Sequence, residues 1–189
     1  MKIIVLNRNI SQPLVDELPH VEIIPDSAIL HSGKPFFVPS FSSKWKYEIS
    51  IAFRNARLGK NIAAKFANRY YDAFTIVAKT IPCDIVESSS SAITYAFDGS
   101  FILGEWIEID AIKSLESITI TIGNKTETIS ISQLEIDKTI ALLSKYLTLK
   151  IGDIITPAHL SIEGDIMIDN TVNASIENIN ENCLKLKFK

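Results

Sequence analysis

Glu48 is the acidic residue of this sequence whose surroundings are most suggestive of chemistry. It opens a run in which polar or small residues alternate with large apolar ones, the pattern of a strand with two unlike faces. The apolar face carries Ile49, Ile51 and Phe53, and Glu48 begins the other face. Charged residues on strands usually face solvent. The spacing therefore leaves open whether Glu48 is an exposed carboxylate or a buried one placed for chemistry.

Lys79 is a basic residue at an unusual point of the chain. It directly follows residues 74–78, FTIVA, an apolar and β-branched run that predicts a buried strand. Burial of an ammonium group costs free energy unless an anion pairs with it. The sequence predicts either a buried Lys79 with an acidic partner or the end of a strand that reaches solvent.

Length, composition and charge are those of an ordered globular protein. The chain has 189 residues, of which 47% are hydrophobic, and ~100 to 200 residues is the common size of one domain. Its net charge is −3 and its 19 basic residues are scattered along the sequence, so we expect no nucleic-acid partner. No apolar run approaches the ~20 residues of a membrane span, and MKIIVL predicts a first strand rather than a secretory signal. We expect a cytoplasmic protein without a membrane partner.

The cysteine and histidine residues do not indicate a metal centre. Cys83 and Cys183 lie far apart and form no CxxC pair, so neither a zinc site nor a disulfide framework is expected. His20 and His31 have the polar neighbours typical of surface histidines. His159 has no evident partner in the sequence, and both a structural role and an approach to a binding pocket stay open.

The first half of the chain predicts strands, loops and one helix. Residues 7–26 are expected to be irregular because their three prolines restrict the backbone. Residues 33–41 predict an extended, Phe-rich segment packed on a core. Asn61 can cap a helix that ends near Asp72, because apolar residues recur there at intervals of three and four. The polar run 87–91 predicts a short linker.

The second half predicts a hairpin, a helix and a charged edge strand. Residues 117–130 alternate in polarity around a Gly-Asn turn, the pattern of a β-hairpin. Ser132 and Glu135 have the spacing of a capping box, and the apolar stripe that follows predicts a helix packed on the sheet. Residues 183–189 alternate apolar residues with lysines, which predicts an edge strand protected from aggregation by charge.

Five sequence blocks in register give the chain a family resemblance. The blocks are RLGKNI at 57–62, RYYD at 69–72, AFDGS at 96–100, LG at 103–104 and TLKIGD at 148–153. In this order they resemble the fumarylacetoacetate hydrolase family, and within it the chain looks most like small acylpyruvate hydrolases and 2-hydroxyhepta-2,4-diene-1,7-dioate isomerases. The resemblance implies a mainly β fold with few α-helices, a mixed β-roll or sandwich, and a homodimer. It implies one domain over residues 1–189, with an N-terminal strand and loop region at 1–45 and a β-rich core at 46–189.

The resemblance also implies a metal site, from which this sequence departs. Members of the family bind a divalent ion, commonly magnesium, through a Glu-x-Glu pair and a later Asp, and the ion holds a 2-oxo acid and stabilises its enolate. The first Glu matches Glu48, but Ser50 and Lys79 occupy the other two positions. We expect no cofactor, and an ion pair between Lys79 and Glu48 in place of the metal. The alternative is a residual Mg or Mn site at Glu48.

Departures continue at the positions that the family uses for substrate. Its Asn-Tyr-x-x-His segment, whose His transfers protons from a mobile lid, corresponds to Arg8, Asn9 and Ile10, with Pro13 roughly at the His position. A proline side chain cannot transfer a proton.

Three further family positions are altered. A family Arg corresponds to Cys83, which leaves Asp84 as the retained neighbour, and a Thr-Gly-Thr-Pro loop is shortened to Thr156 and Pro157. The family Lys before the Phe-Asp-Gly block corresponds to Tyr95. The substrate-binding positions implied by the resemblance are Arg8, Asn9, Tyr95, Asp98 and Thr156.

Three functional readings follow. In the first, the chain has lost metal-dependent hydrolase or isomerase activity and acts as a ligand-binding or structural homodimer. In the second, it remains a hydrolase or isomerase of a small 2-oxo acid, either with a residual Mg at Glu48 or with Lys79 in place of the cation as a clamp or Schiff-base amine. In the third, Glu48 and Lys79 are unrelated surface residues of a scaffold.

Overall fold

The structure, a computed structural model, describes residues 1–17, 19–88 and 92–189. The strands are β1 (Lys2–Leu6), β2 (Val21–Pro25), β3 (Ile29–His31), β4 (Pro35–Phe36), β5 (Trp45–Asn55), β6 (Tyr71–Pro82), β7 (Phe101–Leu103), β8 (Ile107–Glu108), β9 (Ser117–Ile122), β10 (Lys125–Ser130), β11 (Ile154–Thr156), β12 (His159–Asp165), β13 (Thr171–Ile176) and β14 (Asn180–Phe188). The α-helices are α1 (Ala64–Ala67), α2 (Cys83–Ser88) and α3 (Ile136–Tyr146). Within the described ranges no helix is long and apolar enough to cross a membrane.

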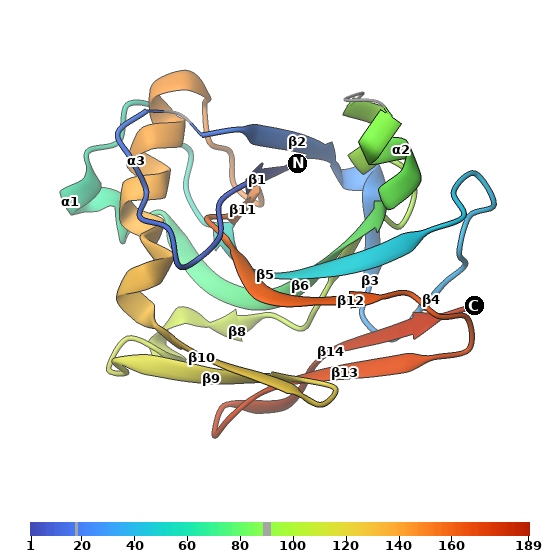
Figure 1. The fold of residues 1–189 in the computed structure, drawn as a ribbon. Helices are drawn as coiled ribbons and strands as arrows, with labels where there is room; N and C mark the ends of the chain where they lie inside the picture. The colour runs from blue at the N-terminus through green and yellow to red at the C-terminus, as the bar shows by residue number, and fades with distance from the viewer. Residues whose placement is uncertain (18, 89–91) are drawn as a thin grey trace.

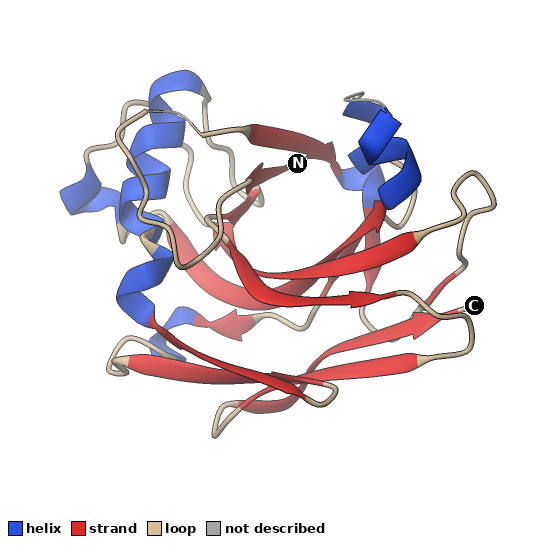
Figure 2. Cartoon of the chain, in the orientation of Figure 1, coloured by secondary structure: helices blue, strands red, loops and turns tan. Residues whose placement is uncertain are grey.

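The strands form two sheets, and the larger one is curled (Figure 1). The larger sheet has nine strands in the order β2-β1-β11-β5-β6-β7-β3, with β12 also paired to β5 and β8 to β6. The smaller sheet has five strands in the order β10-β9-β13-β14-β4. Strands dominate the molecule and the helices lie at its two sides (Figure 2). The mainly β fold class expected from the sequence is confirmed.

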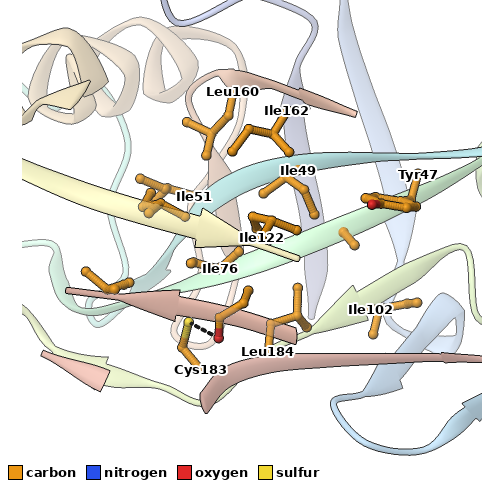
Figure 3. Packing of buried hydrophobic residues seen from close by; sticks show 14 of the residues in the cluster. Tyr47, Ile49, Ile51, Ile76, Ile102, Ile122, Leu160, Ile162, Cys183 and Leu184 are labelled. Carbon is orange, nitrogen blue, oxygen red and sulfur yellow. Dashed lines mark hydrogen bonds between the residues drawn. The ribbon is translucent and has the colours of Figure 1, made fainter. Parts of the chain in front are cut away.

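The main core lies between the two sheets. Alternation along β5 directs Ile49 and Ile51 to this core, where they meet Ile122 of β9 and Leu184 of β14 (Figure 3). Each of these side chains is at most 2% exposed, and full burial of such a side chain stabilises the fold by about 1.5–3 kcal/mol. The strand predicted from Glu48 onward is therefore present. Strand β5 spans Trp45–Asn55 and is longer than the segment 48–53, over which the apolar residues alternate.

The other face of β5 looks into the curl of the larger sheet. Ala52 packs there with Ile3 of β1, Ile24 of β2 and Val77 of β6. Because side chains alternate across a strand, Glu48 and Ser50 belong to the same face as Ala52. The curl therefore gives the polar face of β5 an enclosed environment.

Helix α3 covers the outer face of β1 and β11. Its Ile140 and Leu143 pack with Ile4 and Ile155, so the predicted helix and its contact with the sheet are confirmed. The predicted cap is wrong. The capping box is formed by Ser130 and Gln133 on a preceding 3₁₀ turn, and Glu135 has a left-handed backbone with φ of 47°.

Two predictions for the first half of the chain are wrong. Residues 7–26 contain strand β2, because Pro25 stands at its last position and leaves the preceding ladder to β1 intact. The helix expected from Asn61 to Asp72 is reduced to the single turn α1, and β6 already begins at Tyr71. Asn61 has φ of 52° and its amide donates to the Ser144 carbonyl at 2.9 Å, so tertiary pairing replaces the predicted cap.

The remaining predictions are confirmed in part. The hairpin at 117–130 has the predicted register, with Ile122 opposite Lys125. In the segment 33–41, Phe36 is buried but Phe37 is 71% exposed. Strand β14 is not an edge strand, because β13 and β4 flank it. The linker expected at 87–91 begins within α2, and residues 89–91 lie outside the described residues.

Candidate functional site

The register of β5 and β6 places Glu48 directly opposite Lys79. Lys79 does not end its strand as the solvent-exposed alternative requires, because β6 continues to Pro82. Its Nζ lies 3.6 Å from Oε1 of Glu48, and the two side chains are 6% and 17% exposed. The predicted contact is present. The reading of Glu48 and Lys79 as unrelated surface residues is therefore wrong.

Glu22 is a second and closer partner of Lys79 that the sequence did not identify. Its Oε2 and Oε1 atoms lie 3.2 and 3.4 Å from Lys79 Nζ. Glu22 is only 6% exposed, because β2 closes the curl and directs this side chain inward. The signal in the sequence was VEIIP, a Glu within an apolar β-branched run, but the neighbouring prolines argued for a loop.

Tyr95 covers the ammonium group from the adjacent 3₁₀ turn, Ala92–Tyr95. Lys79 Nζ lies 4.9 Å from the centre of the Tyr95 ring, a cation–π geometry. Burial raises the pKa of the Tyr95 phenol, and the Glu22 and Glu48 carboxylates raise it further while Lys79 opposes them. Tyr95, one of the substrate-binding positions implied by the resemblance, therefore lies against Lys79.

His159 and Ser50 complete the side of the site formed by β12 and β5. His159 lies opposite Ser50 in the ladder between these strands, and its Nδ1 lies 4.0 Å from Oε2 of Glu48. Ser50 is buried next to Glu48 on the same face. His159 thus has the acidic neighbour that the sequence did not reveal.

Thr156 lies on the same inner surface as Glu22. Val5 is the cross-strand partner of both residues, of Glu22 on β2 and of Thr156 on β11. The Thr156 hydroxyl is buried and has no hydrogen-bond partner within the described residues. Its backbone position is therefore compatible with the substrate-side role implied by the resemblance.

The site consists of the buried Lys79 ammonium group and two carboxylates, so negative charges outnumber positive ones. Glu22 and Glu48 carry two negative charges and Lys79 carries one positive charge, so the cluster has a net charge of −1 when His159 is neutral. In a site of low effective dielectric these charges interact strongly, and removal of one partner from a buried pair costs about 3–5 kcal/mol. The arrangement is suited to a cation rather than to a second anion.

Arg8 does not contribute to this site. Its guanidinium donates to the carbonyls of Gln12, Gln133, Leu134 and Pro157 and to the Glu135 carboxylate. Five acceptors match the five N–H donors of an arginine. Burial lowers the Arg8 pKa, and Glu135 partly opposes that effect. Arg8 fixes the N-terminal segment to the start of α3.

Other positions implied by the resemblance also lie in local structures. The Asn9 side chain accepts hydrogen bonds from the amide and hydroxyl of Ser11 at 2.9 and 2.6 Å. Asp98 is exposed in the turn before Gly99, which has φ of 80°. Asp84 accepts hydrogen bonds from Ser42 and Ser43, which lower its pKa to about 2 and hold the start of α2.

A cavity lies away from the charged cluster, at the other end of β5. It has a volume of about 550 Å³. Arg54, Trp106 and His31 line it, together with apolar side chains that include Ile29. The Arg54 guanidinium lies over the Trp106 ring and is also bonded to Asp72 at 2.8 Å. This cavity is distinct from the Lys79 cluster, because Arg54 lies six residues along β5 from Glu48 and no residue of the cluster lines the cavity.

Solved structures share this fold at low sequence identity. A 5-carboxymethyl-2-hydroxymuconate delta-isomerase from Mycobacterium smegmatis is 20% identical with a TM-score of 0.81, and the match covers 99% of this chain and 78% of that one. A fumarylpyruvate hydrolase from Pseudomonas aeruginosa, in complex with Mn²⁺ and pyruvate, is 16% identical with a TM-score of 0.80 and covers 100% and 90%. A 2-hydroxyhepta-2,4-diene-1,7-dioate isomerase from Mycobacterium marinum is 19% identical with a TM-score of 0.80 and covers 99% and 73%.

Sequence comparison gives the family directly. No curated protein matches the chain. The model of the fumarylacetoacetate (FAA) hydrolase C-terminal domain matches residues 7–157. The matched residues run from the end of β1 through β11 and include β5 and β6, the strands that carry Glu48 and Lys79. Fold and sequence agree over most of the chain, and the protein belongs to the fumarylacetoacetate hydrolase family.

Proposed function

We propose that this protein is a member of the family in which the Lys79 ammonium group replaces the divalent metal ion, and that it has lost metal-dependent hydrolase or isomerase activity. The observation that carries the proposal is the position of Lys79 Nζ, 3.2 Å from Glu22 and 3.6 Å from Glu48. A cation bound between these carboxylates would occupy the same space. In this account the protein acts in the cytoplasm as a ligand-binding or structural homodimer.

The residues present do not fit Mg or Mn. These hard cations take about six oxygen ligands in octahedral geometry. The family ligand positions are Glu48, Ser50 and Lys79, and of these only Glu48 supplies a carboxylate. Glu22 adds a second carboxylate, but the Lys79 ammonium lies against both and would repel a divalent ion.

The catalytic groups that the family places around the metal are also altered. Pro13 stands where the resemblance puts a proton-transferring His, and proline has no titratable group. Arg8 lies in the same segment, and its guanidinium N–H groups donate to backbone carbonyls and to the Glu135 carboxylate. Neither residue is available to bind or protonate a 2-oxo acid. This supports the loss of activity independently of the metal site.

Metal binding and turnover test the proposal. Isothermal titration with MnCl₂ and an assay with acylpyruvates in the presence of Mg or Mn should show no stoichiometric binding and no turnover. The matched variant is Ser50→Glu with Lys79→Asp, which restores three carboxylates and should bind Mn²⁺. Turnover by the wild-type protein that disappears in Glu48→Gln would contradict the proposal.

A second candidate function uses Lys79 as the electrophile for a 2-oxo acid. Its buried position beside Tyr95 favours this reading, because desolvated lysines form Schiff bases in some enzymes. The two carboxylates oppose it, since attack on a carbonyl requires the neutral amine, and deprotonation of Lys79 removes the charge that pairs with Glu22 and Glu48. Borohydride reduction in the presence of pyruvate should leave Lys79 unmodified, and a trapped adduct at Lys79 would favour the second function.

The homodimer is a separate part of the proposal and has its own measurement. The mass in solution, measured by light scattering after size-exclusion chromatography, should be twice that of one chain of 21.0 kDa. A mass of one chain across the accessible concentration range would contradict the proposed homodimer. It would leave the assignment of Lys79 unchanged.

A further inference from the structure

Two segments that are distant in sequence form one surface beside α1 and the C-terminal end of α3. Residues 56–70 and 144–151 are joined by two backbone hydrogen bonds of 2.9 Å between Gly59 and Leu149. Lys60 Nζ reaches across the junction to the Tyr146 carbonyl at 2.9 Å. Figure 1 shows α1 and α3 together on the same side of the molecule. The fold therefore makes one continuous surface from the two segments.

The two segments carry cations and no anions, although Asp16 of a third segment lies beside them and lines a cavity with Ala64 and Lys145. The two segments contain six of the 19 basic residues of the chain and none of its 22 acidic residues. Within the described ranges, none of the six forms an ion pair with a carboxylate. The six exposed residues, which we call the basic surface, are Arg57, Lys60, Lys65, Arg69, Lys145 and Lys150. Basic residues that are scattered in the sequence are thus grouped in space, while the chain as a whole is acidic.

Large apolar side chains are exposed among these cations. They belong to Leu58, Phe66, Tyr146 and Ile151. Leu58 is 65% exposed and Ile151 is 71% exposed. Phe66 lies under Lys65 Nζ and the Arg69 guanidinium, 5.0 and 5.2 Å from the ring centre. The surface is therefore both basic and apolar.

We propose that the basic surface docks the protein on an anionic membrane surface. Clustered Lys and Arg residues are attracted to acidic lipid headgroups, and apolar side chains among them enter the boundary between headgroups and acyl chains. Nucleic acid would satisfy the cations, and the exposed rings of Phe66 and Tyr146 could stack on bases, but the two most exposed apolar side chains, Leu58 and Ile151, are aliphatic and offer no stacking surface. The combination favours a lipid surface, and this proposal replaces the expectation, drawn from the lack of a membrane-spanning run, that the protein has no membrane partner. It does not depend on the state of the Lys79 site.

Vesicle co-sedimentation tests this proposal. The wild-type protein should bind phosphatidylcholine vesicles containing about 30% phosphatidylserine, bind pure phosphatidylcholine far less, and dissociate as salt shortens the Debye length to about 3 Å near 1 M. Lys60→Gln, Lys65→Gln, Lys145→Gln and Lys150→Gln together should reduce partitioning by about fivefold per cation. Leu58→Ser with Ile151→Ser should reduce the binding that remains at intermediate salt.

A matched control separates the basic surface from overall charge. Lys34→Gln, Lys44→Gln, Lys185→Gln and Lys187→Gln change the net charge equally at lysines outside the two segments and should leave vesicle binding intact. Absence of wild-type binding to the anionic vesicles, or an equal loss in both quadruple variants, would overturn the proposal. So would binding of a single-stranded oligonucleotide that requires the basic surface when the vesicles are not bound.

Discussion

Arg8 and Lys79 are both buried cations, and they differ in the kind of group that surrounds each of them. Each residue is 5% exposed. Four of the five acceptors of Arg8 are backbone carbonyls, and the fifth is the Glu135 carboxylate, which also pairs with Lys138. Lys79 has two carboxylate partners. An excess of one negative charge is what we expect if, as proposed, a group of charge +1 has taken a position suited to charge +2.

Removal of the Lys79 ammonium should give the largest effect. Lys79→Met leaves Glu22 and Glu48 buried without a cation, which should lower the free energy of unfolding by about 3–5 kcal/mol at neutral pH. Millimolar MnCl₂ should recover part of this loss, because the paired carboxylates can then bind the ion. Urea denaturation with and without MnCl₂ measures both effects. Equal stability of the variant and the wild type would contradict the assigned ion pair.

Arg8→Lys should be the next most destabilising change. The ammonium group keeps the charge near Glu135 but cannot reach the carbonyls of both Gln12 and Pro157, because it lacks the planar fork of arginine. We expect a loss of about 2 kcal/mol from the unsatisfied carbonyls, with no recovery by MnCl₂. Denaturation under the same conditions provides the measurement. Recovery by MnCl₂ here would remove the distinction between the two cations.

The two carboxylates should differ in how much they contribute. Glu22 is nearer to Lys79 and more buried than Glu48, so Glu22→Gln should cost about 2 kcal/mol and Glu48→Gln about 1 kcal/mol. Thermal unfolding of the two variants side by side gives the comparison. A larger cost for Glu48→Gln would show that the contact inferred from the family positions, rather than the one found in the fold, dominates.

Tyr95→Phe should have the smallest effect at neutral pH, within about 0.5 kcal/mol, because the ring over Lys79 is retained. The Tyr95 pKa is raised in the folded state, so the unfolded chain loses this proton first. The wild type should therefore be fully stabilised below about pH 10 and lose stability as pH rises above it. The variant should lose less over that range, and Tyr71→Phe, at another half-buried tyrosine of raised pKa, is the control for a general alkaline effect.

The sequence predicted the elements whose apolar pattern is local. The face of β5, the hairpin of β9 and β10, and α3 were identified because the repeat of the pattern matches the repeat of the element. The helix from Asn61 was wrong because pairing of Gly59 with Leu149 overrides the local periodicity. Such pairing depends on the fold, so no local pattern encodes it.

The sequence predicted only the part of the site that lies on two adjacent paired strands, β5 and β6. Glu48 and Lys79 meet across two adjacent strands, and family positions pointed to both. Glu22 reaches Lys79 only because β2, β1, β11, β5 and β6 curl in that order, which the sequence did not reveal. Arg8 was placed with the substrate by its position, while its role is set by carbonyls from residues 133, 134 and 157.

The most direct test of the central claim is an anomalous difference map from crystals grown with MnCl₂. The wild-type protein should show no manganese peak between Glu22 and Glu48, and the Lys79 ammonium group should occupy that position. Crystals of the Ser50→Glu, Lys79→Asp variant should show the peak. A fully occupied octahedral manganese bound to Glu48 in the wild-type protein would contradict the replacement of the metal by Lys79.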